Sequence, residues 1–251
     1  KEMKIGTATP TDEELAQAKH HFIGHLSVQD YYSIGQYEED ALEKIEEIFE
    51  KNDFAVLVGG SMMYEKAVVE GLNDLPEANA ENQEKLQKIW DEEGLEKLQE
   101  ILKNLDEEYY NVVHKENPRR LLRAIDVIWQ TGRKYSEIIA EPKHKRDFKV
   151  IRIGVTALRE IMYERINLRV DKMLEKGLID EVKSLTKYQK LVPLQTVGYS
   201  EIFKYLEGTW DLDFAIEEIK KNSRRYAKRQ ETWNRKVENV TWLPYDYSEE
   251  Q

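Results

Sequence analysis

Residues 220–236 carry the strongest concentration of chemically active side chains in the sequence. They contain eight Lys or Arg and one Glu, so their local charge is +7 in a chain whose formal net charge is −11. No Gly or Pro interrupts the segment, and helical spacing places most of the cations along one face. A charge run is usually a solvated helix face, but cations gathered against an acidic background favour a phosphate-rich ligand. The candidate phosphate-binding residues are Lys221, Arg224, Arg225, Lys228 and Arg229. We expect Tyr226 and Trp233 to pack this helix onto the core.

A second basic cluster begins at residue 117. Pro118 suits the first turn of a helix, and Arg119 and Arg123 are four residues apart with Arg120 beside them. Three arginines at a helix start could hold phosphates. Ion pairs with nearby acids explain the same pattern equally well, so the residues alone leave both interpretations open.

A third set of cations lies on a predicted amphipathic helix over residues 159–174. Arg165, Arg169 and Lys172 share one face of it. This helix follows a predicted strand at 150–155, which returns the chain to its core.

The elements that would position these cations belong to an α/β fold. Residues 54–58 form a short apolar run typical of a strand buried on both faces of a parallel sheet, and Gly59-Gly60-Ser61 then turns into a predicted helix over 62–70. The hydroxyl of Ser61 could contact an anion or a base edge there. A highly charged helical region follows, without a strand pattern until about residue 148. We therefore predict an α/β core in two parts, 1–75 and 146–251, around a helical insertion at 76–145.

Composition limits the remaining possibilities. At 251 residues and 40% hydrophobic content the chain can bury a sizeable core. It has no Cys, no run of about 18 apolar residues and no visible signal peptide, so we expect a cytoplasmic protein without a membrane span. His21 and His25 have the spacing of paired metal ligands, but Gly24 and the lack of a nearby third ligand favour an ordinary loop. We assign no metal-ligating residue.

Seven motifs in order resemble the bacterial tRNA dimethylallyltransferases, also called isopentenyl-tRNA transferases. The resemblance covers essentially the whole chain, and the last motif is the most specific. The motifs are Ile5-Gly6-Thr7-Ala8, His20-His21, Val58-Gly59-Gly60-Ser61, Asn117-Pro118-Arg119-Arg120-Leu121-Leu122-Arg123-Ala124, residues 165–173, Gln195-Thr196-Val197-Gly198-Tyr199 and residues 224–233.

The resemblance implies a nucleotide-kinase-like core, related to the P-loop NTPases, with a helical insertion that grips the anticodon stem-loop. It implies transfer of a dimethylallyl group from dimethylallyl diphosphate to N6 of the adenosine 3′ of the anticodon, with Mg²⁺ as cofactor. Arg169 would contact the diphosphate, and Ser61, Arg119, Arg120, Arg123 and the basic residues of 220–236 would bind tRNA. We expect a monomer.

The sequence departs from the family pattern in several places. The family's phosphate loop and the Asp that acts as base lie upstream of the motif near Lys1, so we expect this stretch alone to be inactive. Thr9 stands where many members have Lys, Met62 where Gly is usual, and Gln83 where an Arg is common. The missing loop leaves a non-catalytic RNA-binding module as the alternative. A phosphotransferase on a related core would have no need for two distant arginine-rich helices.

Overall fold

The computed structural model describes residues 1–7 and 9–246, which divide into two compact units. The first unit takes residues 1–33, 56–62 and 150 onward, and the second takes 34–55 and 63–149. The predicted insertion at 76–145 therefore lies wholly inside the second unit, which also includes residues 34–55 and 63–75.

The first unit is built on four helices and a small sheet. The helices are α8 (Arg159–Glu175), α9 (Leu178–Ser184), α10 (Tyr199–Leu206) and α11 (Leu212–Asn234). They enclose a core that includes Val170, Leu178, Tyr199 and Ile219, against which Met3 and Ile5 pack from the N-terminal segment. A short helix α1 (Asp12–Gln17) follows Thr11, which caps it and forms a capping box with Glu14. Two 3₁₀ turns, at Thr186–Tyr188 and Val192–Leu194, connect α9 to α10.

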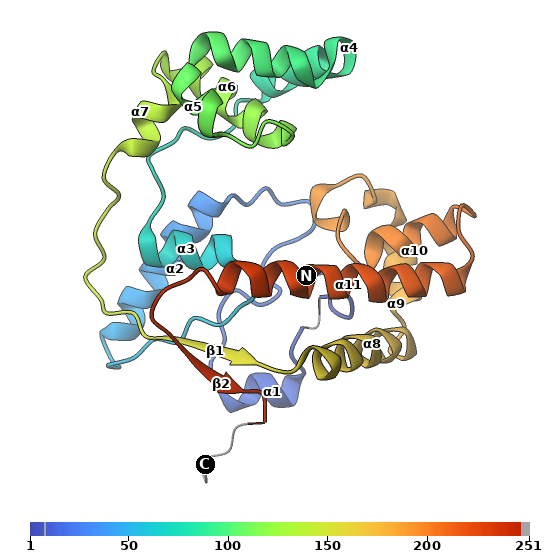
Figure 1. Ribbon diagram of the computed structural model, residues 1–251. Helices are drawn as coiled ribbons and strands as arrows, with labels where there is room; N and C mark the ends of the chain where they lie inside the picture. The colour runs from blue at the N-terminus through green and yellow to red at the C-terminus, as the bar shows by residue number, and fades with distance from the viewer. Residues whose placement is uncertain (8, 247–251) are drawn as a thin grey trace. The chain divides into compact units, whose positions relative to one another are not determined.

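The sheet consists of two parallel strands, β1 (Arg152–Thr156) and β2 (Val240–Pro244), with Arg152 opposite Val240 (Figure 1). The prediction of a parallel sheet is thus confirmed. The strand predicted at 54–58 is wrong within the described residues: this segment has no strand hydrogen bonding, and Val56 and Val58 are more than four-fifths exposed. An apolar run becomes a buried strand only when a neighbouring strand pairs with it and other elements cover its faces.

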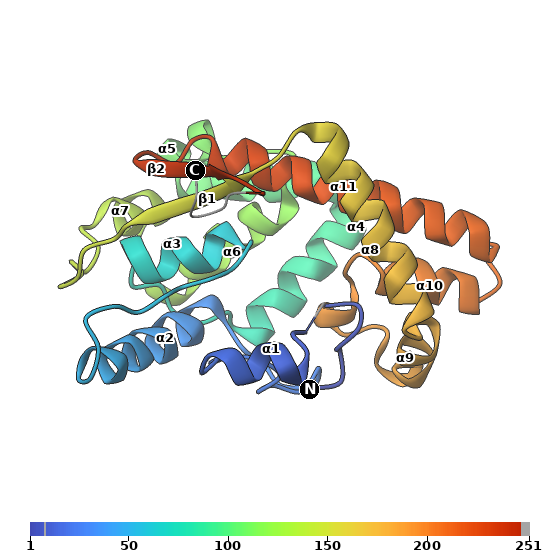
Figure 2. The ribbon, with the colours of Figure 1, turned by 90° about the horizontal axis from the view of Figure 1, so that it is seen from below.

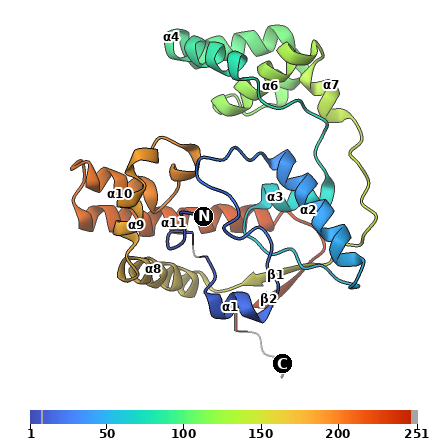
Figure 3. The same ribbon diagram turned by 180° about the vertical axis from the view of Figure 1, so that it is seen from behind.

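The regular secondary structure described in the second unit is all helical. It contains α2 (Ile34–Phe49), α3 (Met62–Glu70), α4 (Ala80–Leu105), α5 (Glu107–Val112), α6 (Pro118–Thr131) and α7 (Tyr135–Ala140). Helices α4 to α7 gather into one group, visible from both sides in Figures 1 and 3. Their apolar stripes meet in a core with Leu86, Leu98 and Leu102 from α4 and Leu121 and Ile125 from α6.

Two buried carboxylates hold this helical group together. Asp106 caps α5 and accepts hydrogen bonds from the backbone N–H and the hydroxyl of Ser136, at 2.7 and 2.9 Å. Asp126 on α6 accepts from Asn82 and Gln130, each at 3.0 Å. Each carboxylate joins helices distant in sequence, and their hydrogen bonds compensate for burial.

None of the described helices has the length and apolar character required to cross a lipid bilayer.

Candidate nucleic-acid interface

The basic helix α11 lies beside α8 (Figure 2). Two polar side-chain contacts join the two helices. Arg224 donates to the side-chain oxygen of Asn167 at 2.6 Å, and Lys220 forms an ion pair with Asp171 at 2.8 Å. Asn167 and Asp171 are one helical turn apart on α8, so both face α11. These contacts fix the position of α11 relative to α8 and hold the Arg224 side chain in one orientation.

The remaining cations predicted on α11 differ in how far they are engaged. Lys221 pairs with Glu218 on the same helix at 2.7 Å, and Arg225 donates a longer hydrogen bond of 3.3 Å to Asn222. Lys228 and Arg229 are exposed, and neither forms an ion pair within the described residues. The exposed cationic face therefore lies mainly over Arg225, Lys228 and Arg229.

Tyr226 and Trp233, the aromatic residues in the basic half of α11, are not in the core. Tyr226 is 47% exposed and Trp233 is 40% exposed, so the expectation that they pack α11 onto the core is wrong. The guanidinium of Arg229 lies 5.7 Å from the centre of the Tyr226 ring. An exposed aromatic ring beside exposed cations is a surface on which a nucleic-acid base can stack.

The Gly-Gly-Ser turn is tied to α11. The Gln230 amide donates to the Gly60 carbonyl oxygen at 2.6 Å. A Cβ atom on Gly60 would come within 2.3 Å of that amide nitrogen, so glycine permits the close approach. Ser61 follows immediately and is exposed. The structure thus brings Ser61 to the C-terminal half of α11, as a shared site requires.

Arg169 is placed differently from the other predicted residues. It is exposed on α8, between Asn167 and Asp171 in sequence, and within the described residues its side chain forms no ion pair. At about 100° per residue it projects roughly 200° around the helix from Asn167. Arg169 therefore points away from α11, and the structure does not join it to the α11 cations. Its predicted contact with a diphosphate stays a prediction.

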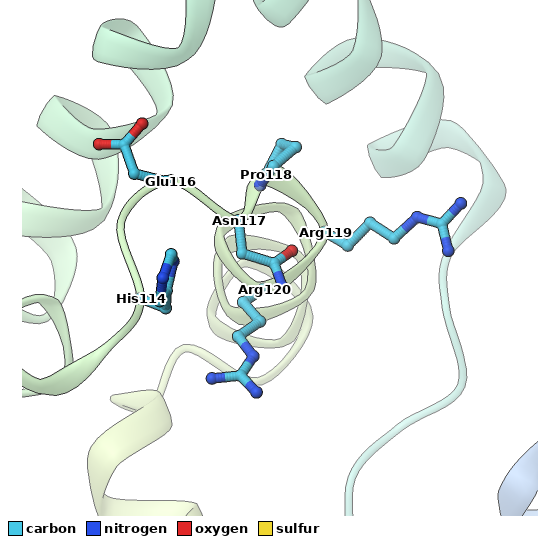
Figure 4. Close-up of a pocket in the computed structure, with 6 residues that line it drawn as sticks. All are labelled: His114, Glu116, Asn117, Pro118, Arg119 and Arg120. Atoms are coloured by element: carbon cyan, nitrogen blue, oxygen red, sulfur yellow. The ribbon is translucent and has the colours of Figure 1, made fainter. Parts of the chain in front are cut away.

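The arginines of α6 separate into two kinds. Arg119 and Arg120 are exposed and line a cavity of about 410 Å³ together with His114, Glu116, Asn117 and Pro118. Figure 4 shows the two guanidinium groups extending in different directions from the first turn of α6. Arg123 instead pairs with the buried Asp126 at 3.2 Å and donates to the Pro76 carbonyl oxygen. Of the two interpretations open for this cluster, the ion pair describes Arg123, whereas Arg119 and Arg120 form no ion pair with any described residue and can meet a ligand.

Sequence reasoning missed the residues that orient Arg224 and Arg225, and the residue that ties Gly60 to α11. Asn167 and Gln230 lie inside the recognised motifs, but their partners are 57 and 170 positions away. Glu201, which accepts from Asn222 at 2.8 Å and thereby braces Arg225, carries no signal of this role in the sequence.

Side chains that could bind a metal ion do not cluster in the described part of the chain. In the described ranges no group of three His, Asp or Glu side chains is arranged to hold a metal. His25 packs edge-on against Phe22 and Tyr32 instead, with ring centres 5.4 and 5.5 Å apart. We therefore assign no ligand to Mg²⁺.

Exposed arginines and lysines in two clusters on an α/β chain are typical of proteins that bind nucleic acid. The particular family follows from comparison. Residues 1–237 match the family model described as IPP transferase, and the chain belongs to this family.

Several relatives are similar over nearly the whole chain. A tRNA dimethylallyltransferase of Christiangramia forsetii is 48% identical over 98% of this chain and 82% of its own length. The tRNA dimethylallyltransferase 1 of Bacteroides thetaiotaomicron is 45% identical over 96% of this chain and 79% of its own length.

Solved structures agree with the sequence comparison. The tRNA isopentenylpyrophosphate transferase of Bacillus halodurans is 35% identical and has a TM-score of 0.70 over the whole of this chain and 80% of its own. A eukaryotic dimethylallyltransferase acting on tRNA is 25% identical with a TM-score of 0.81, over 96% of this chain and 63% of its own. These likenesses confirm the predicted α/β fold class.

Proposed function

We propose that the protein is a tRNA dimethylallyltransferase, which transfers a dimethylallyl group from dimethylallyl diphosphate to the exocyclic N6 of the adenosine 3′-adjacent to the anticodon. The match of residues 1–237 to the family model carries this proposal, and the free cations on α11 and α6 support it. The reaction forms a bond between N6 and C1 of the prenyl group. The bond from C1 to the diphosphate oxygen breaks, and N6 loses a proton.

The residues of this chain divide into three roles in that reaction. Arg225, Lys228 and Arg229 hold tRNA phosphates on α11, and they supply position and affinity without reading sequence. Ser61, beside α11, offers a hydroxyl to the edge of the flipped adenine. Arg169 neutralises charge that develops on the departing diphosphate.

The helix α6 adds a second phosphate site. Arg119 and Arg120 are exposed and make no ion pair in the described structure, so they can neutralise phosphates of the anticodon stem-loop. Mg²⁺ would assist the leaving diphosphate as a Lewis acid, but the residues described here do not form a site for it, and no step is assigned to it. We infer that the protein acts as a monomer in the cytoplasm, where tRNA is found.

The full-length enzyme tests the proposal directly. Incubation with an anticodon stem-loop and dimethylallyl diphosphate should add one dimethylallyl group per RNA, seen by mass spectrometry. Arg169→Ala should lower kcat/KM for the donor by about 10²-fold or more while RNA affinity stays within about twofold. No transfer by the wild type would overturn the proposed function, and unchanged donor kinetics in Arg169→Ala would overturn the role of this arginine alone.

A further inference from the structure

Ion pairs are unevenly distributed over the helical group α4–α7. Along α4, Lys85, Lys88 and Lys97 each lie within 3.8 Å of a Glu carboxylate three or four residues away. Arg123 and Arg133 are also paired with acids. This pattern is ordinary for an acidic, solvated helical surface.

A second set of cations in the same group is not paired. Among the described residues, no carboxylate lies within ion-pair distance of Lys103, Lys115, Arg119 or Arg120. Lys103 is close to the C-terminal end of α4, where the paired lysines of that helix stop. These four charges lie between the C-terminal end of α4 and the first turn of α6; Lys134, at the start of α7, also forms no ion pair among the described residues.

A tyrosine ring brings two of these cations together. The Nζ atom of Lys115 lies 4.2 Å from the centre of the Tyr110 ring, and that of Lys103 lies 5.9 Å from it. Two ammonium groups beside one ring repel each other, and an anion bound near both of them offsets that repulsion. The ring attracts each cation, but with both lysines over it Tyr110 has little surface left for stacking a base.

The lysine pair is continuous with the cavity at the start of α6. Lys115 stands in sequence between His114 and Glu116, which both line the cavity together with Arg119 and Arg120. Arg120 extends the cluster further: burial raises the pKa values of Tyr109 and Tyr135, and the nearby charge of Arg120 opposes that rise. The carboxylate of Glu116 is the acidic group of the cavity lining, and it balances part of this charge.

We propose that Lys103 and Lys115, held by Tyr110, form a backbone-binding surface that extends the α6 phosphate site along the RNA. The proposal rests on the proposed function, since it names a further stretch of the same tRNA. Lysine ammonium groups act as point charges that suit phosphate oxygens and carry no base-specific hydrogen-bond pattern. The surface therefore binds RNA without regard to sequence.

A matched pair of double variants in the full-length enzyme tests this surface. Lys103→Ala with Lys115→Ala removes the unpaired charges, and Lys85→Ala with Lys88→Ala removes two paired charges from the same helical group. We expect the first variant to bind an anticodon stem-loop about 3–10-fold more weakly at 0.1 M salt and to lose about one to two units of log–log salt slope. The control variant should bind nearly as the wild type does.

Kinetics and a charge-conserving variant separate binding from folding. The KM for RNA should rise in Lys103→Ala with Lys115→Ala, while kcat and the KM for dimethylallyl diphosphate stay unchanged. Lys103→Arg with Lys115→Arg should restore RNA affinity, which a purely structural role would not require.

Three results would overturn the inference. An equal loss in both alanine variants would show a general effect of net charge, and a loss limited to one RNA sequence would show base reading. Unchanged RNA affinity and salt slope in the first variant would show that Lys103 and Lys115 do not bind RNA. Absence of prenyl transfer by the wild type would instead count against the proposed function, so the two failures are distinguishable.

Discussion

The hydroxyl of Tyr199 donates a 2.6 Å hydrogen bond to a carboxylate oxygen of Glu181. The same carboxylate accepts from three consecutive backbone amides, those of Lys4, Ile5 and Gly6, at 2.8 to 3.1 Å. Successive N–H groups that converge on one anion form a strong anion-binding turn. Here the anion is a side chain from α9, so the N-terminal motif is anchored to the core that also contains Val170, the neighbour of Arg169.

Glu181→Gln should lower the free energy of unfolding by about 1–3 kcal/mol, because a charged acceptor of four hydrogen bonds becomes neutral and one of its oxygens becomes a donor. Tyr199→Phe should cost about 1 kcal/mol, since the three amide contacts remain. Urea unfolding measures both. Glu175→Gln, at an exposed acid of α8, is the control, and an equal midpoint for Glu181→Gln and the control would contradict this anchor.

Gly6→Ala should disturb the same anchor from the other side. A Cβ atom on Gly6 would lie 2.3 Å from Cε2 of the buried Tyr199 ring, so the backbone or the ring must shift. We expect a loss of about 1–3 kcal/mol in the free energy of unfolding. Combining Gly6→Ala with Tyr199→Ala should relieve the clash. The double mutant should then lose less free energy of unfolding than the sum of the two single losses. Strictly additive losses would contradict the steric explanation.

Glu181 and Tyr199 also predict how stability depends on pH. Burial alone would raise the pKa of Glu181, but hydrogen bonds from Ile5, Tyr199, Gly6 and Lys4 lower it below its ordinary value. Its stabilisation is therefore present above the unfolded pKa of about 4.3 and is lost as the pH falls through the folded value. Burial and the Glu181 contact raise the pKa of Tyr199, so its contribution is present below about pH 10 and is lost as the pH rises further.

Urea midpoints across the pH range check both signs. Glu181→Gln should flatten the decline on the acid side, and Tyr199→Phe should flatten the decline above about pH 10. A Glu181→Gln profile with the same acid slope as the wild type would show that other carboxylates cause the decline.

Most helices could be predicted from the sequence because their signals are local. Met62–Glu70 was predicted with its observed bounds, and Thr11 and Pro118 mark helix starts through capping and a fixed backbone angle. Strands depend on distant partners. The apolar run at 54–58 is exposed, whereas β2 (Val240–Pro244), which no sequence signal distinguished, pairs with β1 about 90 residues earlier in the chain.

The candidate site shows the same division. The residue types and motifs indicated which cations to examine, but they did not show which of them are free. Arg119 and Arg123 look equivalent in sequence, and only the buried Asp126 beside Arg123 separates them. A side chain's partner is a property of the fold, and therefore ion pairs between distant segments could not be predicted from helical spacing.

Arg123 and the Arg119–Arg120 pair should behave differently when replaced. Arg123→Ala removes one donor of the buried Asp126 carboxylate and should cost about 1–3 kcal/mol in the free energy of unfolding, because the other hydrogen bonds remain. Arg119→Ala with Arg120→Ala should leave the unfolding midpoint unchanged and lower the RNA salt slope by about 0.7–0.9 per lost contact. If both variants had the same RNA affinity and the same unfolding midpoint, the assignment of Arg123 to the fold and of Arg119 and Arg120 to RNA would be contradicted.

Arg225→Ala with Lys228→Ala should weaken the binding of every anticodon stem-loop by a similar factor. Among the described residues, Arg225 makes one hydrogen bond, at 3.3 Å to Asn222, and the Lys228 ammonium group makes no ion pair, so both are available to phosphates. We expect about one to two units less salt slope, with the modified adenosine and the unfolding midpoint unchanged. Lys183→Ala with Lys190→Ala removes the same charge outside α11 and serves as the control. Affinities for a substrate stem-loop and for a loop-sequence variant, each measured with wild type and double mutant, decide the matter. If the loss is confined to one sequence, α11 reads bases, and the exposed Tyr226 ring is then the group to replace next.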